Sequence, residues 1–522
     1  MTSVAHPRSS SIRLQICDWP ALVGLSAVVA VAIALRLYPI VIFPSINWWD
    51  EIFQATEQAH RLIYGYGLVP WEFQLGARSW LLPGVVTGLM EIARAIGDGP
   101  AYYLPVIATA FAALAAAPVI CCFLWCRQWF GVTAALVAAL VVATDPQLVY
   151  FGGRTLSEVI ATHLLVIAIY LVWQGHRIES RRLIMLAGIM FGLTGLLRIQ
   201  LAPTVSFLLV WAAWNDWRRW APSLTIGVAS VLLLGGALDW ATLGYPFASV
   251  WHYVVYNEIY NVSAGFGTEP WYYYALGEFG LLGTAFGLVA IAVALGARRM
   301  PVLLVAAAIT LVVHSAIAHK EYRFIYPMIL LLTMLASIGF AQLASWGAQA
   351  LRGRKVPPNA AITASAGLSV ALWAMASFHV WTDTTMTELR ARVHDNLSAA
   401  NFVADMPAIC GLGLYGEKGR DWARYGGYTV LHRPVPLFWP EDERELRAQT
   451  AGFNFLLYTA VPPPELGFET TRCFGKTCIA QRPGECAALP PPAMPFPDPL
   501  AGMAPPASAF PAIQPRAASS RP

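Results

Sequence analysis

Two adjacent carboxylates, Asp50 and Glu51, open a polar stretch between two apolar segments. A carboxylate within hydrogen-bond reach of a hydroxyl group can remove its proton as that hydroxyl attacks, so both acids are candidates for a general base. Asp50 is the first choice and Glu51 the second. The alternative is structural, because acids at the start of a helix also interact favourably with its positive N-terminal dipole.

A helical period continues from these acids to Ile63, with polar residues on one face and apolar residues on another. Such a helix, flanked by tryptophans, is suited to lie in a membrane interface with its apolar face toward lipid. The polar face comprises Asp50, Gln54, Glu57 and Arg61, the apolar face Ile52, Thr56, Ala59 and Ile63, and the flanking tryptophans are Trp48, Trp49 and Trp71.

A second cluster of ionisable residues is the segment HKEYRF, residues 319–324, between two apolar runs. Lys320 carries a mobile point charge and Arg323 a forked set of donors, a combination suited to a phosphate group. His319 and Arg154, the latter in the segment GGRTLSE, are candidates for additional cations at the same site. Alternatively, these are ordinary cations at the ends of membrane spans, extending toward water and paired with Glu321.

The elements that position these residues must lie in a membrane. The 522-residue chain is 57% hydrophobic and only 12% charged, which excludes an ordinary soluble domain. The net charge of +4 gives no indication of nucleic-acid binding. Apolar stretches between residues 20 and 381 predict a helical bundle with about eleven crossings. The segment Leu81–Ile96 breaks the parity, and we interpret it as re-entrant or interfacial.

Loop charges predict the orientation of the bundle. Arginines gather in alternate loops, which the positive-inside rule assigns to the cytoplasm. The other loops then face outward, and they contain the acidic stretch and the HKEYRF segment. We therefore expect residues 1–19 to be cytoplasmic, 20–384 to form the transmembrane domain with 44–80 as its first catalytic loop, 385–486 to form a small soluble extracytoplasmic domain, and 487–522 to be a disordered tail rich in Pro and Ala.

Four of the eight cysteines, Cys410, Cys473, Cys478 and Cys486, lie in the predicted soluble domain. In an oxidising compartment they can form two disulfides, with three possible pairings. A zinc site is the alternative, but the spacing fits no common zinc pattern. We favour the disulfides.

Four motifs in order resemble glycosyltransferase family 22, the lipid-phosphomannose-dependent mannosyltransferases of GPI-anchor and N-glycan assembly. HKEYRF is similar to the HKE-x-RF signature of that family. The stretch from DEIFQ through AH, YGYG and WE to RSW resembles its acidic first loop, and GRTLSE and GFGTEPWYYY resemble two further elements. Glu158 and Glu269 depart from the common pattern, which bears on the acceptor more than on the reaction. GPI mannosyltransferases have the most similar motifs.

The resemblance implies an all-α GT-C-type bundle that transfers mannose from a polyprenyl- or dolichyl-phosphate donor to a glycolipid or glycan acceptor, with inversion. It implies Asp50 or Glu51 as base and no cofactor or metal. The partners would be the lipid-linked donor, the acceptor and membrane lipids. The donor phosphate would be bound by His319, Lys320, Arg323 and Arg154, and other substrate contacts would come from Glu321, Trp71, Glu72, Arg78 and Trp271.

Two other functions fit the composition. One is a GT-C enzyme that uses another lipid-linked sugar or pentose. The other is a transporter, although transporters usually carry their ionisable residues near the midplane on broken helices. The bias toward Arg and Ala over Lys is typical of a GC-rich bacterial genome, so we expect the inner membrane with the loops facing the periplasm, or the ER lumen if the chain is eukaryotic.

Overall fold

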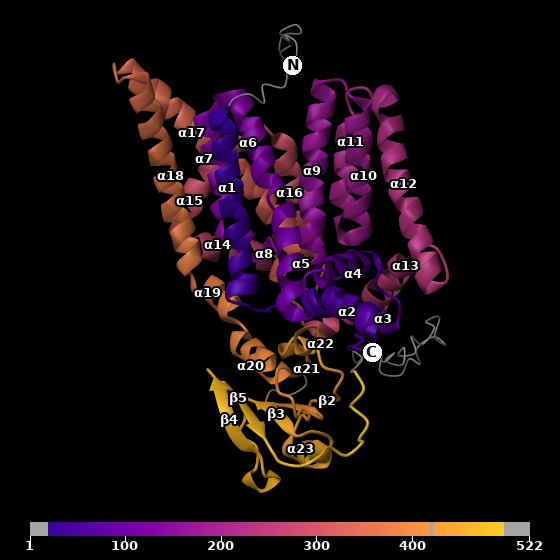
Figure 1. The fold of residues 1–522 in the computed structure, drawn as a ribbon. Coiled ribbons are helices and arrows are strands. Elements are labelled where there is room, and N and C mark those ends of the chain that lie inside the picture. The colour runs from indigo at the N-terminus through magenta and orange to yellow at the C-terminus, as the bar shows by residue number, and fades with distance from the viewer. Residues whose placement is uncertain (1–18, 417–420, 495–522) are drawn as a thin grey trace.

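The computed structural model describes residues 19–416 and 421–494, so the N-terminal segment and most of the predicted tail lie outside the described residues. Long helices form a bundle, and a smaller α/β domain lies at one end of it (Figure 1). The bundle helices are α1 (Trp19–Leu37), α5 (Pro100–Leu114), α6 (Ala117–Phe130), α7 (Val132–Thr144), α9 (Ser157–Arg177), α10 (Arg181–Leu197), α11 (Ala202–Ala213), α12 (Trp217–Leu243), α14 (Tyr273–Leu282), α15 (Phe286–Ala297), α16 (Pro301–Ala316), α17 (Tyr326–Gly353) and α18 (Pro358–Thr382).

Within the described residues, seven helical segments are long and apolar enough to cross a membrane, and three shorter apolar helices accompany them. The chain is therefore a multi-pass membrane protein, as its composition predicts. The predicted number of about eleven crossings stays a prediction. Because lipid cannot drive apolar helices together, small residues at the contacts matter. A Cβ on Gly339 of α17 would lie 2.0 Å from the carbonyl oxygen of Ala292, so glycine lets α15 and α17 pack backbone to backbone.

Short helices gather at the end of the bundle that faces the C-terminal domain (Figure 1). They connect the spans on this side and include the predicted amphipathic helix, which begins with a π-helical turn and continues as α2. These elements are η2 (Ile52–Thr56), α2 (Glu57–Tyr64), α3 (Trp71–Gln74), α4 (Leu81–Arg94), α8 (Pro146–Phe151), α13 (Ala248–Val254), η4 (Val255–Ile259), η5 (Val262–Phe266) and η7 (Tyr322–Ile325).

The environment of the amphipathic helix differs from our expectation. Ala55 and Ala59, on or beside its apolar face, are fully buried in one cluster with Leu82 and Val86 of α4. The segment Leu81–Ile96 supplies this cover as α4, which is not among the candidate spans. The apolar face therefore packs against protein rather than lipid.

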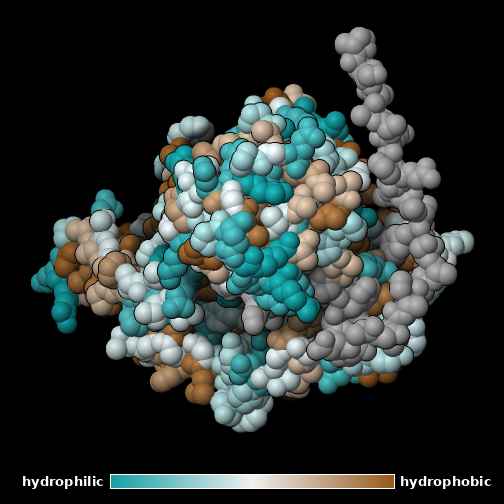
Figure 2. Space-filling model, turned by 90° about the horizontal axis from the view of Figure 1, so that it is seen from below, coloured by the Kyte–Doolittle hydropathy of each residue, from teal (hydrophilic) through white to brown (hydrophobic). Residues whose placement is uncertain are grey.

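The C-terminal domain is a five-stranded mixed sheet with strand order β2-β1-β3-β5-β4. β1 is parallel to β2 and β3, and β5 is antiparallel to β3 and β4. Viewed from this end, hydrophilic side chains gather on the surface (Figure 2). Its elements are α19 (Thr384–Ala391), α20 (His394–Ala404), β1 (Leu412–Tyr415), α21 (Asp421–Arg424), α22 (Gly427–Leu431), β2 (Leu437–Phe438), α23 (Glu443–Gln449), β3 (Phe455–Tyr458), β4 (Glu469–Phe474) and β5 (Thr477–Gln481).

Two disulfides stabilise this domain, which confirms that reading of its cysteines over the zinc site. Cys410 bonds to Cys486 and closes a long loop around the sheet. Cys473 bonds to Cys478 across the β4–β5 turn. The sequence left three pairings open, and the sheet register selects this one, since Cys473 and Cys478 are directly paired in the ladder.

The C-terminal domain packs on the loop of residues 44–80, the predicted first catalytic loop. Ile52, Phe53 and Leu68 of that loop share one apolar cluster with Leu397 and Val430 of the domain. Burial of such side chains contributes roughly 25 cal/mol per Å² of apolar area removed from water. The domain and the predicted catalytic loop therefore form one continuous structure.

Candidate active site

Arg323 joins three carboxylates that come from three separate parts of the sequence. Its guanidinium contacts Asp50, lies 3.0 Å from Glu158 (Nη1 to Oε1) and 2.5 Å from Glu321 (Nε to Oε2). Asp50 comes from the loop of residues 44–80, Glu158 from the first turn of α9, and Arg323 from the short helix η7. The fork of donors in arginine is what allows one side chain to hold all three acids.

The charge of Arg323 is consequently shared among acids of the protein. Burial alone would raise the pKa of Glu321, but the charge of Arg323 and hydrogen bonds from His319 and Arg323 lower it to about 2. The Arg323 side chain is only 5% exposed. Its geometry orients Asp50 and leaves little free positive charge for a substrate phosphate.

Glu51, the second candidate base, lies behind the site. Both of its carboxylate oxygens are 3.0 Å from Nη1 of Arg154, and both side chains are buried. The hydroxyl of Thr155 donates to the Glu51 carbonyl oxygen at 2.5 Å, and Arg154 also donates to the carbonyl oxygen of Ser45. Burial raises the pKa of Glu51 despite the charge of Arg154. Neither Glu51 nor Arg154 lines the cavity beside Asp50.

A cavity of about 1080 Å³ opens beside Asp50, between the C-terminal domain and the ends of the helices that face it. Such a volume accommodates sugar rings together with a phosphate group. Trp271, a predicted substrate contact, is 73% exposed and is not among the lining residues. The predicted site residues that do line the cavity are Asp50, Trp71, Glu72, Arg78, His319, Lys320, Glu321 and Arg323.

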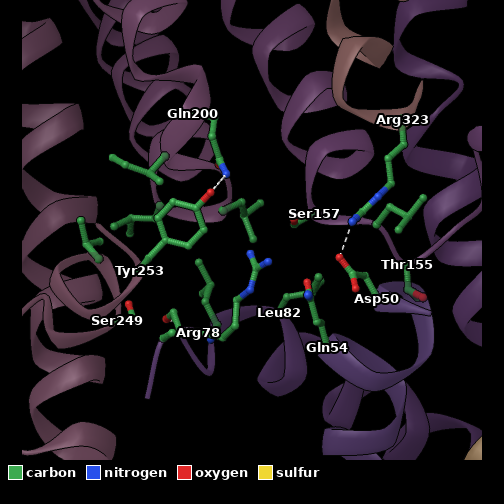
Figure 3. A pocket seen from close by; sticks show the side chains of 18 residues that line it. Asp50, Gln54, Arg78, Leu82, Thr155, Ser157, Gln200, Ser249, Tyr253 and Arg323 are labelled. Atoms are coloured by element: carbon green, nitrogen blue, oxygen red, sulfur yellow. Dashed lines mark hydrogen bonds and ion pairs between the residues drawn. The ribbon is translucent and has the colours of Figure 1, made fainter. Parts of the chain in front are cut away.

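Arg78 is one of the cations of this cavity that form no ion pair among the described residues. Within the described part of the chain its guanidinium has no ion-pair partner, its buried Nε has no hydrogen-bond partner, and it lies 5.6 Å from the ring centre of Tyr253. Figure 3 shows Arg78 in a small adjoining pocket between Tyr253 and Gln54, with Asp50 and Arg323 on the other side. An anionic group would supply the missing partner.

Glu72 is a second carboxylate close to Asp50. It accepts a hydrogen bond of 2.8 Å from Gln54. Burial and then the negative charge of Asp50 raise its pKa, while Arg78 acts in the opposite sense. Two neighbouring acids in unequal surroundings are typical of sites that transfer protons.

His319 and Lys320 also belong to the basic residues that line the cavity. Nδ1 of His319 lies 2.8 Å from the carbonyl oxygen of Gly267, and Nε2 lies 3.3 Å from Glu321. Burial lowers the pKa of His319, but the hydrogen bonds to Glu321 and Gly267 outweigh it and the pKa is raised. Lys320 donates to the carbonyl oxygens of Glu269 and Ile317 and contacts no carboxylate among the described residues.

Sequence reasoning did not select Arg198 and Glu158 as site residues. Arg198 is 3% exposed, lines the cavity and lies 3.6 Å from Glu158, which it shares with Arg323. The signal for Arg198 was present, since a cation inside an apolar stretch usually lines a polar interior. Glu158 could not be assigned from the sequence because its partners are distant along the chain.

The sequence was compared with models of known protein families. Residues 27–410 match the Alg9-like mannosyltransferase family. This chain belongs to that family. The family resemblance drawn from the motifs is thereby confirmed, and the residues that line the cavity from position 411 onward lie outside the family match.

Two relatives illustrate the Alg9-like mannosyltransferase family. GPI mannosyltransferase 3 of Drosophila melanogaster is 28% identical over 321 residues, which cover 57% of this chain and 53% of the relative. GPI mannosyltransferase 3 of Yarrowia lipolytica is 29% identical over 303 residues, which cover 56% of this chain and 58% of the relative. The chain thus spans little more than half of the length of these curated relatives.

The structure of ArnT from Cupriavidus metallidurans bound to undecaprenyl phosphate is similar with a TM-score of 0.58 and 14% sequence identity, and the match covers 89% of this chain and 98% of that one. At this identity the likeness concerns the fold alone. This member of the Alg9-like mannosyltransferase family therefore has the predicted GT-C-type helical bundle with a small C-terminal domain.

Proposed function

We propose that this protein transfers mannose from a polyprenyl- or dolichyl-phosphate donor to a hydroxyl group of a glycolipid or glycan. Family membership supports the reaction type. The observation that carries the proposal is the position of Asp50, held by Arg323 at the wall of a cavity large enough for a sugar acceptor.

In this reaction the acceptor oxygen bonds to the anomeric carbon as the bond from that carbon to the phosphate oxygen breaks. The hydroxyl proton passes to the Asp50 carboxylate, and the lipid phosphate leaves with the bonding electrons. A single displacement inverts the anomeric centre. The leaving phosphate gains negative charge, which preorganised cations stabilise best.

We assign the phosphate to basic residues whose charge is not already neutralised by a carboxylate of the protein. Arg323 already faces three carboxylates and Arg154 is paired with Glu51. Arg78 and Lys320 line the cavity without a carboxylate ion pair among the described residues. We therefore assign the phosphate to Arg78 and Lys320, with His319 assisting, and assign Arg323 to the positioning of Asp50.

The test is transfer of labelled mannose from polyprenyl-phosphate-mannose to lipid in membranes that contain wild-type protein or Asp50→Asn at equal levels. Glu91→Gln, which removes an exposed carboxylate of α4, is the matched control. We expect transfer by the wild type and the control and none by Asp50→Asn. If the wild type fails with mannose but transfers another lipid-linked sugar, the donor assignment is wrong and the alternative GT-C reaction replaces it.

We also propose that the cavity opens on the extracytoplasmic side, in the periplasm of a bacterium or the lumen of the ER. Two disulfides in the C-terminal domain support this orientation, because such bonds persist in oxidising compartments. The start of α1 and the Arg-rich α17–α18 connection lie at the opposite end of the bundle (Figure 1). In bacterial cells with a permeable outer membrane and an intact inner membrane, a cysteine placed at Val461, which is 82% exposed, should react with a membrane-impermeant maleimide; labelling only after the inner membrane is broken contradicts this orientation. In sealed ER vesicles the same cysteine should react only after the vesicles are opened.

A further inference from the structure

Part of the cavity wall comes from the C-terminal domain, and its residues in α21 lie beyond the end of the family match at position 410. Trp422 and Ala423 of α21 line the cavity, as do Glu388 of α19 and Arg392 directly after it. Trp49 and Asn47 of the first outer loop line the same cavity. We call Trp422, Arg392 and Glu388 the C-terminal wall. The sequence motifs assign no role to these three residues.

The C-terminal wall is held rigidly against the catalytic loop. Glu57, fully buried, accepts hydrogen bonds from the backbone N–H groups of Leu68, Tyr428 and Thr429 and from the Thr429 hydroxyl, at 2.7 to 3.2 Å. Tyr103 of α5 donates to the carbonyl oxygen of Thr429. These contacts fix α22, which follows α21 closely. A preformed wall loses little conformational entropy when it binds a ligand.

The Trp422 ring is anchored next to the proposed base. It packs edge-on against Phe53, with ring centres 5.0 Å apart. Phe53 is 2% exposed and stands three residues after Asp50. The indole Nε1 of Trp422 is buried and has no hydrogen-bond partner among the described residues. Trp422 lines the cavity, and an indole ring there offers an apolar face on which a ligand can stack.

Two polar residues that line the same cavity as Trp422 have free hydrogen-bonding capacity. Arg392 donates one hydrogen bond of 2.7 Å to Asn47 and makes no ion pair among the described residues. Glu388, one helical turn before Arg392, has no hydrogen-bond or ion-pair partner within the same described part of the chain. A cavity wall that offers an aromatic face, a forked donor and a carboxylate acceptor matches a sugar ring, whose C–H face is weakly positive and whose hydroxyl groups both donate and accept.

We propose that the C-terminal wall is the acceptor subsite, in which Trp422 stacks on a sugar residue of the acceptor while Arg392 and Glu388 bind its hydroxyl groups. The assignment of this subsite to the acceptor rests on the proposed function, whereas its ability to bind a carbohydrate does not. The acceptor is assigned here, rather than the donor, because the free cations suited to the donor phosphate are Arg78 and Lys320. Trp49, adjacent to Asp50 in the chain, connects this wall with the base.

The experiment uses octyl α-D-mannoside, below its micelle concentration, as an acceptor probe for the full-length protein in nanodiscs, with polyprenyl-phosphate-mannose as donor. We expect Trp422→Ala to raise the KM for octyl mannoside about tenfold, equivalent to about 1.4 kcal/mol, and to leave the KM for the donor unchanged. Trp422→Phe should give a smaller rise because it keeps an aromatic face. Trp214→Ala, at a residue that is 77% exposed and outside the cavity lining, is the matched control.

A binding measurement separates this proposal from the proposed reaction. Saturation-transfer NMR with octyl mannoside, and with octanol as the sugar-free comparison, requires no turnover. We expect sugar-ring signals with Asp50→Asn that weaken when Trp422→Ala or the exposed Arg392→Ala is added. If the wild type transfers mannose and the Trp422 and Arg392 variants match it in both assays, the subsite is refuted and the function stands. If the sugar binds through Trp422 but no mannose is transferred, the reaction is refuted and the subsite stands.

Discussion

Asp50 and Arg323 form an ion pair although they are 273 residues apart in the sequence. The same guanidinium also forms ion pairs with Glu158 and Glu321. These pairs hold the arginine in place, and the arginine in turn orients the Asp50 carboxylate. The HKEYRF segment, which the sequence predicts to bind a phosphate as a unit, therefore contains residues with two different roles. In the proposed reaction Arg323 positions the base, and the neighbouring Lys320, which makes no ion pair among the described residues, binds the donor phosphate.

Replacing Arg323 by lysine tests the positioning role. Lysine keeps the charge but cannot reach three carboxylates in fixed directions. We expect kcat to fall about 100-fold, the scale of a small misplacement of a catalytic group, with little change in the donor KM. Steady-state kinetics on protein checked by size-exclusion chromatography gives the answer. A variant with unchanged kcat and a weakened donor KM would instead make Arg323 a phosphate ligand.

Removal of Arg154 tests the buried pair with Glu51. An unpaired buried carboxylate remains, so we expect Arg154→Ala to destabilise the protein by about 3–5 kcal/mol. Arg94→Ala breaks the exposed pair with Glu91 and should cost about 0–1 kcal/mol. Thermal unfolding in detergent compares the two. The double variant Glu51→Ala, Arg154→Ala should unfold at a higher temperature than Arg154→Ala alone, and equal or lower stability contradicts the pairing.

Substitution of Glu57 by alanine should loosen the contact between the catalytic loop and the C-terminal domain. The amide N–H groups of Leu68, Tyr428 and Thr429 lose their acceptor. We expect faster hydrogen exchange at these amides, while strand β3 of the same domain stays protected. Mass spectrometry of peptides from both regions measures the effect. Unchanged protection around residues 428 and 429 would show that the carboxylate does not hold the domain.

The raised pKa of His319 predicts a pH dependence of donor binding. A histidine with a raised pKa stays protonated to higher pH and loses its charge as the pH rises through that value. The KM for polyprenyl-phosphate-mannose should therefore increase over the alkaline range in which His319 loses its proton, above the usual pKa of histidine. His319→Gln should show a higher KM that is nearly flat over this range. The same alkaline rise in both proteins would assign the titration to another group.

Local sequence predicted the parts of this protein that depend on neighbouring residues. The length and apolarity of the spans predict the membrane bundle because a bilayer core requires such segments. The amphipathic period predicts α2, and the motif order predicts the family. Frequent charges after residue 385 predict the soluble domain, whose cysteines pair as disulfides.

Contacts between distant segments could not be predicted in this way. The sequence placed Asp50 and Glu51 side by side as candidate bases. In the structure the turn between α8 and α9 brings Arg154 against Glu51, and the turn before α17 brings Arg323 against Asp50. The sequence grouped Trp271 with the substrate contacts, and its side chain lies outside the cavity lining. Neighbours in the chain therefore have different environments.

The sequence by itself determined that this protein lies in a membrane, which family it belongs to and which residue types are available for chemistry, because these follow from composition and short motifs. The tertiary structure alone decided which charges are neutralised and which stay free, and that Glu57 and Trp422 join the C-terminal domain to the site. The physical reason is that the electrostatic energy of a charge depends on distance and burial, and both are set by how helices and domains pack rather than by spacing along the chain.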